Sequence, residues 1–213
     1  YAWAEANEIP IMTHCTRSGV FYTGRFSDVL TSSSPYRINS SSNSYVEILD
    51  RIKLFQSSKL TRKDTKYGCN IFTHPQNYIP ILEKYPKLKI CFGHFGGSDE
   101  MLGEKSKVMS QGLDQYNWHE FILSLIINRP DFENVYTDIS YTLSELKIFT
   151  KLNSYFETNA ASKILFGTDF YMTAQEKQEE AILRQSLDQL SNEQFRNIAA
   201  VNNNKYLQST YYK

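Results

Sequence analysis

Four short apolar runs along the chain each end at a polar residue, and they predict buried β-strands. The runs are bounded by Pro, Gly or Asn, which is typical of strands in a parallel sheet covered on both faces. They are residues 10–13 before His14, 88–93 before His94, 134–137 before Asp138 and 163–168 before Asp169.

Helical patterns fill the intervals between these runs. Apolar residues recur at spacings of three and four in 118–128, and Ser191 with Gln194 forms a capping box before a last helix. The helices are expected at 2–7, 76–85, 118–128, 143–154, 174–190 and 193–207. Strands that alternate with helices of this length predict βα units and an α/β fold with a parallel sheet.

The interval before the second predicted strand contains an unusual segment at 31–44, TSSSPYRINSSSNS, with seven serines in fourteen residues. Its few apolar groups cannot offset the entropy lost on ordering, so we expect a mobile loop. We treat the chain, residues 1–213, as a single domain, because 213 residues are too few for two comfortable ones.

Charge and cysteine content exclude several classes of function. Lys and Arg together number 23, as do Asp and Glu, so the net charge is zero. This balance argues against a protein that binds nucleic acid or a membrane surface through bulk charge. No apolar run approaches the length of a membrane span. Three cysteines without a CxxC pair predict neither a disulfide framework nor a structural zinc site, and they favour a reducing compartment, the cytoplasm.

The polar residues that end the predicted strands are the candidates for chemistry. In a parallel α/β fold the carboxyl ends of the strands meet at the ligand face, which here presents two His and two Asp. Imidazole and carboxylate groups bind zinc and also act as general acids or bases. Cys15 adjoins His14, but neighbours on a strand point to opposite faces, so a Cys–His nucleophile pair is disfavoured.

Several segments, in order, resemble one known family. EIPIMTHC, THPQNYIPILEKYPKLKICFGHFGG, NVYTDIS and KILFGTDF are similar to the later half of the amidohydrolase-related (amidohydrolase 2) family. These metal-dependent TIM-barrel hydrolases include the aminocarboxymuconate-semialdehyde decarboxylase group. The resemblance covers about 8–207 and is weak over 17–65. It implies a (β/α)8 barrel of which this chain holds roughly strands five to eight.

The resemblance also implies roles for individual residues. His14 would be a metal ligand, and Asp169 would bind the metal or take a proton from the nucleophilic water. His94 would be the catalytic acid or base, or a further ligand. The metal would be a divalent ion, with zinc the first candidate. The activity implied is hydrolysis of a small-molecule substrate by a metal-activated water, with nonoxidative decarboxylation as the alternative in the same family.

For several other residues, the sequence leaves a functional and a structural interpretation open. Asp138 would support the ligands or serve the fold. His74 would contact substrate or order the start of the following helix. Gly96 and Gly97 would let the backbone approach a substrate carboxylate, or they provide loop flexibility. His119 lies inside a predicted helix and is expected to be structural.

One departure from the family is large. Its first strand normally supplies a His-x-His pair to the metal, and this chain contains none. We therefore expect a fragment, or a half-barrel with an incomplete metal site, and a non-catalytic half-barrel is a further alternative. Four strands alone would leave the edges at 10–13 and 163–168 open. We expect these edges to be covered by a second copy in a homo-oligomer, by other chain or by altered packing.

Overall fold

Four parallel strands form one sheet in the order in which they occur in the chain. The computed structural model of the protein describes residues 1–17, 73–103, 117–175 and 177–212. The strands are β1 (Ile11–Thr16), β2 (Ile90–Gly96), β3 (Val135–Asp138) and β4 (Ile164–Leu165). A parallel sheet in unbroken chain order is the arrangement of successive strands in a (β/α)8 barrel, whereas a doubly wound sheet switches order. The predicted α/β fold, with its arc of four barrel-type strands, is confirmed.

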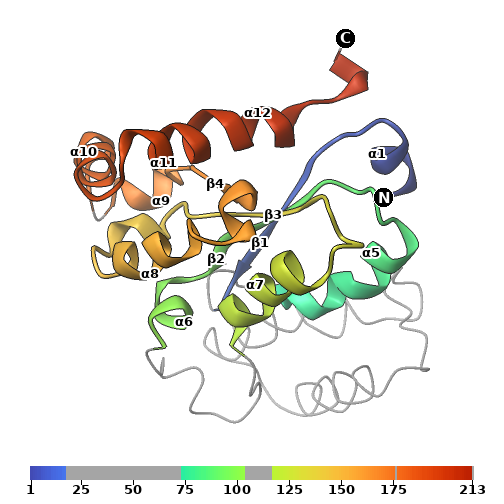
Figure 1. Ribbon diagram of the computed structural model, residues 1–213, viewed down its shortest axis with the longest axis horizontal. Helices are drawn as coiled ribbons and strands as arrows, with labels where there is room; N and C mark the ends of the chain where they lie inside the picture. Colours follow the sequence, from blue (N-terminus) through green and yellow to red (C-terminus); the bar gives the residue numbers. More distant parts are fainter. Residues whose placement is uncertain (18–72, 104–116, 176, 213) are drawn as a thin grey trace, which may run out of the picture.

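Helices surround the sheet (Figure 1). The helix α7 has the predicted bounds, and a π-helical segment at Asn197–Val201 joins α11 to α12. The α-helices are α1 (Ala2–Ala6), α5 (Ile79–Lys84), α6 (Ser98–Leu102), α7 (Trp118–Asn128), α8 (Ile148–Tyr155), α9 (Phe170–Thr173), α10 (Glu179–Gln189), α11 (Asn192–Arg196) and α12 (Asn202–Leu207). Shorter 3₁₀ helices span Pro75–Tyr78, Thr142–Ser144, Asn159–Lys163 and Thr210–Tyr212.

The capping box predicted from the sequence is present at the start of α11. The Ser191 hydroxyl accepts from the Gln194 backbone N–H at 3.1 Å, and the Gln194 side chain accepts from the Ser191 N–H at 2.8 Å. One predicted helix starts later than expected. The helix expected at 174–190 is α10, which begins only at Glu179 because Gln178 is extended, and the separate short helix α9 directly follows the left-handed Asp169.

The alternation of side chains along the strands separates the core from the opposite face of the sheet. Phe92, Val135 and Ile164 pack with the surrounding helices in the main hydrophobic core. Cys15 is fully buried in the same core, whereas His14, its neighbour, lies on the other face and is only partly buried. This confirms the expectation that the two side chains point to opposite faces of the sheet, as successive residues of a strand do.

The outer edge of β4 is covered by the chain itself. The strand predicted at 163–168 forms a ladder only over Ile164–Leu165. On its outer side, the Phe166 N–H donates to the Ile198 carbonyl at 3.0 Å. The buried Asn202 amide donates to the Ile164 and Ala161 carbonyls, both at 2.8 Å. The segment from α11 to α12 therefore satisfies the backbone groups that a neighbouring strand would otherwise pair (Figure 1).

Other expectations lie outside what the structure describes. The segment 31–44, predicted to be a mobile loop, is outside the described residues. Among the described strands, β1 pairs with β2 alone, and a second copy on its outer edge stays a prediction. In the described parts of the chain, no helix has the length and apolar character needed to cross a bilayer.

Candidate active site

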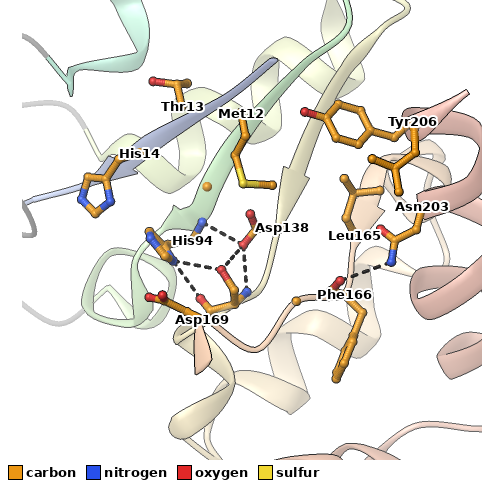
Figure 2. Close-up of a pocket in the computed structure, with 14 residues that line it drawn as sticks. Met12, Thr13, His14, His94, Asp138, Leu165, Phe166, Asp169, Asn203 and Tyr206 are labelled. Atoms are coloured by element: carbon orange, nitrogen blue, oxygen red, sulfur yellow. Dashed lines mark hydrogen bonds between the residues drawn. The ribbon is translucent and has the colours of Figure 1, made fainter. Parts of the chain in front are cut away.

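A pocket of about 470 Å³ lies near the carboxyl ends of the strands (Figure 2). His14, His94, Asp138 and Asp169 all line it. The four polar residues that follow the predicted strands are therefore brought to one cavity, as the parallel topology requires.

The strand register explains how the floor of this pocket is built. His14 pairs with Gly93, and Asp138 pairs with Leu165, so these residues form a row across the sheet. A Cβ at Gly93 would lie 3.6 Å from the Asp138 carboxylate and 3.2 Å from the Thr13 carbonyl. A glycine at this position keeps open the space between His14 and Asp138.

His14 presents a ring nitrogen with no hydrogen-bond partner. Its Nε2 is buried and unpaired among the described residues, and its ring lies edge to face with His94 at 4.9 Å between centroids. Burial, followed by the positive charge that His94 can carry, lowers the pKa of His14. The Thr16 backbone and the Asp169 and Asp138 carboxylates oppose this shift. A neutral imidazole with a free lone pair is what a metal ion needs from a histidine.

His94 reaches the pocket through an unusual backbone. By strand alternation it would face the core, since Gly93 faces the pocket, but His94 and Phe95 have φ of 65° and 48°. This left-handed turn brings the ring back over the sheet beside Asp138 and Ser140 (Figure 2). The ring Nδ1 lies 3.0 Å from the Ser140 carbonyl oxygen. A carbonyl only accepts, so Nδ1 carries the proton, and in the neutral ring Nε2 keeps the lone pair.

Asp138 holds this turn in place. The carboxyl is 3% exposed and accepts the His94 backbone N–H at 3.1 Å and the Ser140 N–H at 2.9 Å. The Ser140 hydroxyl also donates to Oδ1 of Asp138. The Cys91 thiol contacts Oδ2 of Asp138 at 3.7 Å. Because Oδ1 accepts three hydrogen bonds, the geometry favours the supporting role predicted for Asp138.

Asp169 lines the pocket at the same end as His14 and His94 (Figure 2). It follows the β4 segment in a left-handed conformation, with φ of 49°, and its carbonyl accepts from Met172 and Thr173 at the start of α9. Its side chain makes no capping bond, so the carboxylate is not used to begin the helix. It is partly exposed and lines the cavity, where it could act on a ligand.

The other predicted residues lie outside the pocket lining. His74 caps the 3₁₀ helix Pro75–Tyr78, where its Nδ1 accepts from Gln76 N–H at 3.0 Å, and its ring packs on Trp118. This arrangement favours the helix-ordering reading of His74 over substrate contact. His119 is fully buried; its ring nitrogens contact the Phe95 carbonyl at 3.0 Å and the Tyr155 hydroxyl at 2.7 Å.

Gly96 and Gly97 serve close packing of the backbone. Both have positive φ, and a Cβ at Gly96 would lie 2.6 Å from the His119 backbone nitrogen. A Cβ at Gly97 would lie 2.5 Å from the Thr16 hydroxyl. Neither glycine lines the pocket. Their expected contact with a substrate carboxylate stays a prediction.

Three residues of α12 that the sequence pattern did not single out line the pocket, namely Asn203, Tyr206 and Leu207. The Tyr206 hydroxyl is buried without a hydrogen-bond partner among the described residues. Ser140, also in the lining, was missed as well. Its signal was its position two residues after Asp138, where a side-chain carboxylate commonly accepts a backbone N–H. Nothing local marks Tyr206.

The side chains that line the pocket supply some of the ligands that a divalent ion needs. The unpaired Nε2 of His14 and the uncapped carboxylate of Asp169 are ligand types that zinc accepts. However, across residues 1–17, 73–103, 117–175 and 177–212, no three His, Cys, Asp or Glu side chains are placed to hold a metal together. The described residues therefore supply fewer ligands than the three that catalytic zinc usually has.

Comparison with known proteins identifies the family of the chain. One solved structure with a related shape is 2,6-dihydroxybenzoate decarboxylase complexed with 2,6-dihydroxybenzoate, at 14% identity and a TM-score of 0.43. The alignment covers 96% of this chain and 53% of that one, so the chain spans about half its length. No curated protein matches by sequence. The profile of the family described as Amidohydrolase matches residues 1–202, and the chain belongs to this family.

Proposed function

We propose that this chain carries part of the active site of a metal-dependent hydrolase that acts on a small-molecule substrate. The observation that supports the proposal most directly is the buried, unpaired Nε2 of His14 in a pocket shared with His94 and Asp169. A buried polar atom without a partner is costly, so a protein retains one where a ligand completes it.

Each residue has a distinct task in this proposal. His14 and Asp169 would hold the ion, which when bound polarises a substrate carbonyl and acidifies a water molecule. Asp169 would also accept a proton from the attacking water, and His94 would donate a proton to the leaving group. Asp138 would fix the orientation of His94 through the backbone N–H that it accepts.

The first experiment measures zinc binding by calorimetry to the 213-residue chain and two variants. His14→Ala removes the unpaired nitrogen and should weaken zinc binding by roughly tenfold or more. His74→Ala is the matched control, because its ring lies outside the pocket lining and caps a helix instead. Equal zinc affinity in His14→Ala and the wild type would contradict the proposed ligand.

The second experiment distinguishes hydrolysis from decarboxylation. The zinc-loaded chain is incubated with panels of esters, amides and aromatic acids in ¹⁸O-labelled water, and the products are analysed by mass spectrometry. Label in the product identifies hydrolysis, whereas unlabelled product with released CO₂ identifies the decarboxylase alternative. For hydrolysis, Asp169→Asn should remove turnover, since an amide cannot accept the proton of the attacking water. Zinc binding without any turnover would favour the non-catalytic alternative.

A further inference from the structure

The Tyr206 hydroxyl is one of two buried side-chain polar atoms without a hydrogen-bond partner in the described parts of the chain. The other is Nε2 of His14, and both residues line the same pocket. Tyr206 is 4% exposed, and Figure 2 shows its ring extending from α12 with the hydroxyl directed toward the strands that carry Met12 and Asp138. Two unpaired atoms facing one cavity indicate two points of attachment for a ligand.

The hydroxyl is not explained by packing. The Tyr206 ring packs on Tyr136 at 5.2 Å between centroids and belongs to a small apolar cluster with Leu165 and Cys91. A phenylalanine would make the same ring contacts without burying an unpaired O–H. The hydroxyl therefore weakens the fold of the ligand-free chain, and a bound partner is the physical reason for a donor in this position.

The surroundings define the chemistry of that partner. Burial raises the pKa of Tyr206 well above its ordinary range, and Cys91 and the Asp138 carboxylate raise it further. The hydroxyl therefore stays protonated and can donate. The nearby Asp138 carboxylate disfavours a second negative charge, so an uncharged oxygen acceptor fits better than a carboxylate.

Most of the other side chains at this end of the pocket are apolar. Met12, which is 60% exposed, lines it together with Leu165 and Leu207. Asn203 also lines it, and its amide donates to the Phe166 and Ala199 carbonyls. The apolar side chains suit a hydrocarbon body better than a strongly hydrated one. The donor and its apolar surroundings therefore select a small apolar molecule that carries a carbonyl oxygen.

We propose that Tyr206 is a substrate-binding residue that donates a hydrogen bond to an uncharged carbonyl oxygen on an apolar substrate, at the end of the pocket away from His14 and Asp169. This inference rests on the proposed function, because the same cavity would hold the substrate. It assigns to that substrate a carbonyl group and an apolar body.

The test uses two probes of nearly identical shape. Acetophenone has a carbonyl oxygen where α-methylstyrene has a methylene group, so only acetophenone can accept from Tyr206. Affinities are measured by ligand-observed NMR on the full 213-residue chain. Tyr206→Phe should weaken acetophenone binding about five- to tenfold, the loss expected for one net hydrogen bond, and leave α-methylstyrene unchanged.

Three further measurements distinguish a lost hydrogen bond from a general change in the protein. Tyr136→Phe is the matched control, because its ring stacks on Tyr206 but Tyr136 does not line the pocket, and it should bind both probes as the wild type does. Tyr206→Phe should melt at the same or a higher temperature than the wild type without ligand. In the unmutated chain, acetophenone but not α-methylstyrene should shift the ¹³Cζ resonance of Tyr206.

Failure of this inference and failure of the proposed function give different results. Each titration is run with and without zinc, and His14→Ala is included. If only the metal site is wrong, zinc and His14→Ala change nothing, but Tyr206→Phe still weakens acetophenone binding. If Tyr206 is wrong, its variant binds acetophenone as tightly as the wild type. Benzoate is titrated in the same way as a charged probe. Absence of acetophenone binding to the wild type would overturn the proposal, and so would a Tyr206→Phe variant that loses more affinity for benzoate than for acetophenone.

Discussion

The imidazole rings of His14 in β1 and His94 in β2 lie edge to face, with 4.9 Å between their centroids. His14 reaches the pocket by ordinary strand alternation, whereas His94 reaches it through a left-handed backbone. The pairing of the two rings thus depends on the contacts that hold residues 94 to 97 in their positive-φ conformation. Four predictions about this fold and its pocket can be tested by measurement.

The first concerns Asp138, which accepts hydrogen bonds from the His94 N–H, the Ser140 N–H and the Ser140 hydroxyl. Asp138→Ala leaves two buried backbone donors unpaired and should lower the free energy of unfolding by roughly 3 kcal/mol. Asp138→Asn keeps an acceptor oxygen and should lose less. Urea unfolding of both variants checks this order, and equal losses would contradict the role assigned to Oδ1.

The second prediction compares two glycines with positive φ. An alanine Cβ at Gly96 would meet backbone atoms of His119 at 2.6 and 2.9 Å, whereas at Gly103 it would meet nothing within 4 Å. Gly103→Ala should therefore lower the unfolding free energy by about 1 kcal/mol, from the left-handed conformation alone. Gly96→Ala should lose several times more, roughly 3 kcal/mol, because backbone must also move. Thermal unfolding that ranks the two variants equally would refute the close approach of α7.

The third prediction concerns the edge of β4. Asn202→Ala leaves the Ile164 and Ala161 carbonyls without their donor and should lower the unfolding free energy by about 2 kcal/mol. Asn204→Ala is the control; this residue is exposed on the same helix, and its loss should stay within about 0.5 kcal/mol. Hydrogen exchange of the Phe166 amide should also quicken in Asn202→Ala and not in Asn204→Ala.

The fourth prediction is a pH dependence from His119. Burial lowers the pKa of His119 from 6.5 to about 4, so between these values the unfolded chain binds a proton that the folded chain does not. Stability is therefore fully present above pH 6.5 and is lost as the pH falls toward 4, by roughly 3 kcal/mol in total. His119→Gln should reduce this slope in guanidinium unfolding measured from pH 7 to pH 4. An unchanged slope would mean that other groups cause the acid sensitivity.

The sequence by itself determined the elements whose signals are local. The bounds of α7 follow from its apolar spacing, and the capping box of α11 follows from Ser191 and Gln194. It also determined that polar residues at four strand ends would share one cavity, because parallel strands place their carboxyl ends on the same side. These inferences need only neighbours in the chain and the rule of parallel topology.

Only the tertiary structure decided how the site is completed. Strand alternation alone would turn His94 into the core, and the bonds from Asp138 and Thr142 to its backbone stabilise the turn that reverses it. The outer edge of β4 is closed by the Ile198 carbonyl, which accepts the Phe166 N–H. The Tyr206 hydroxyl enters the pocket because α12 packs along that edge. Each depends on residues distant in sequence, whose contacts no local pattern encodes.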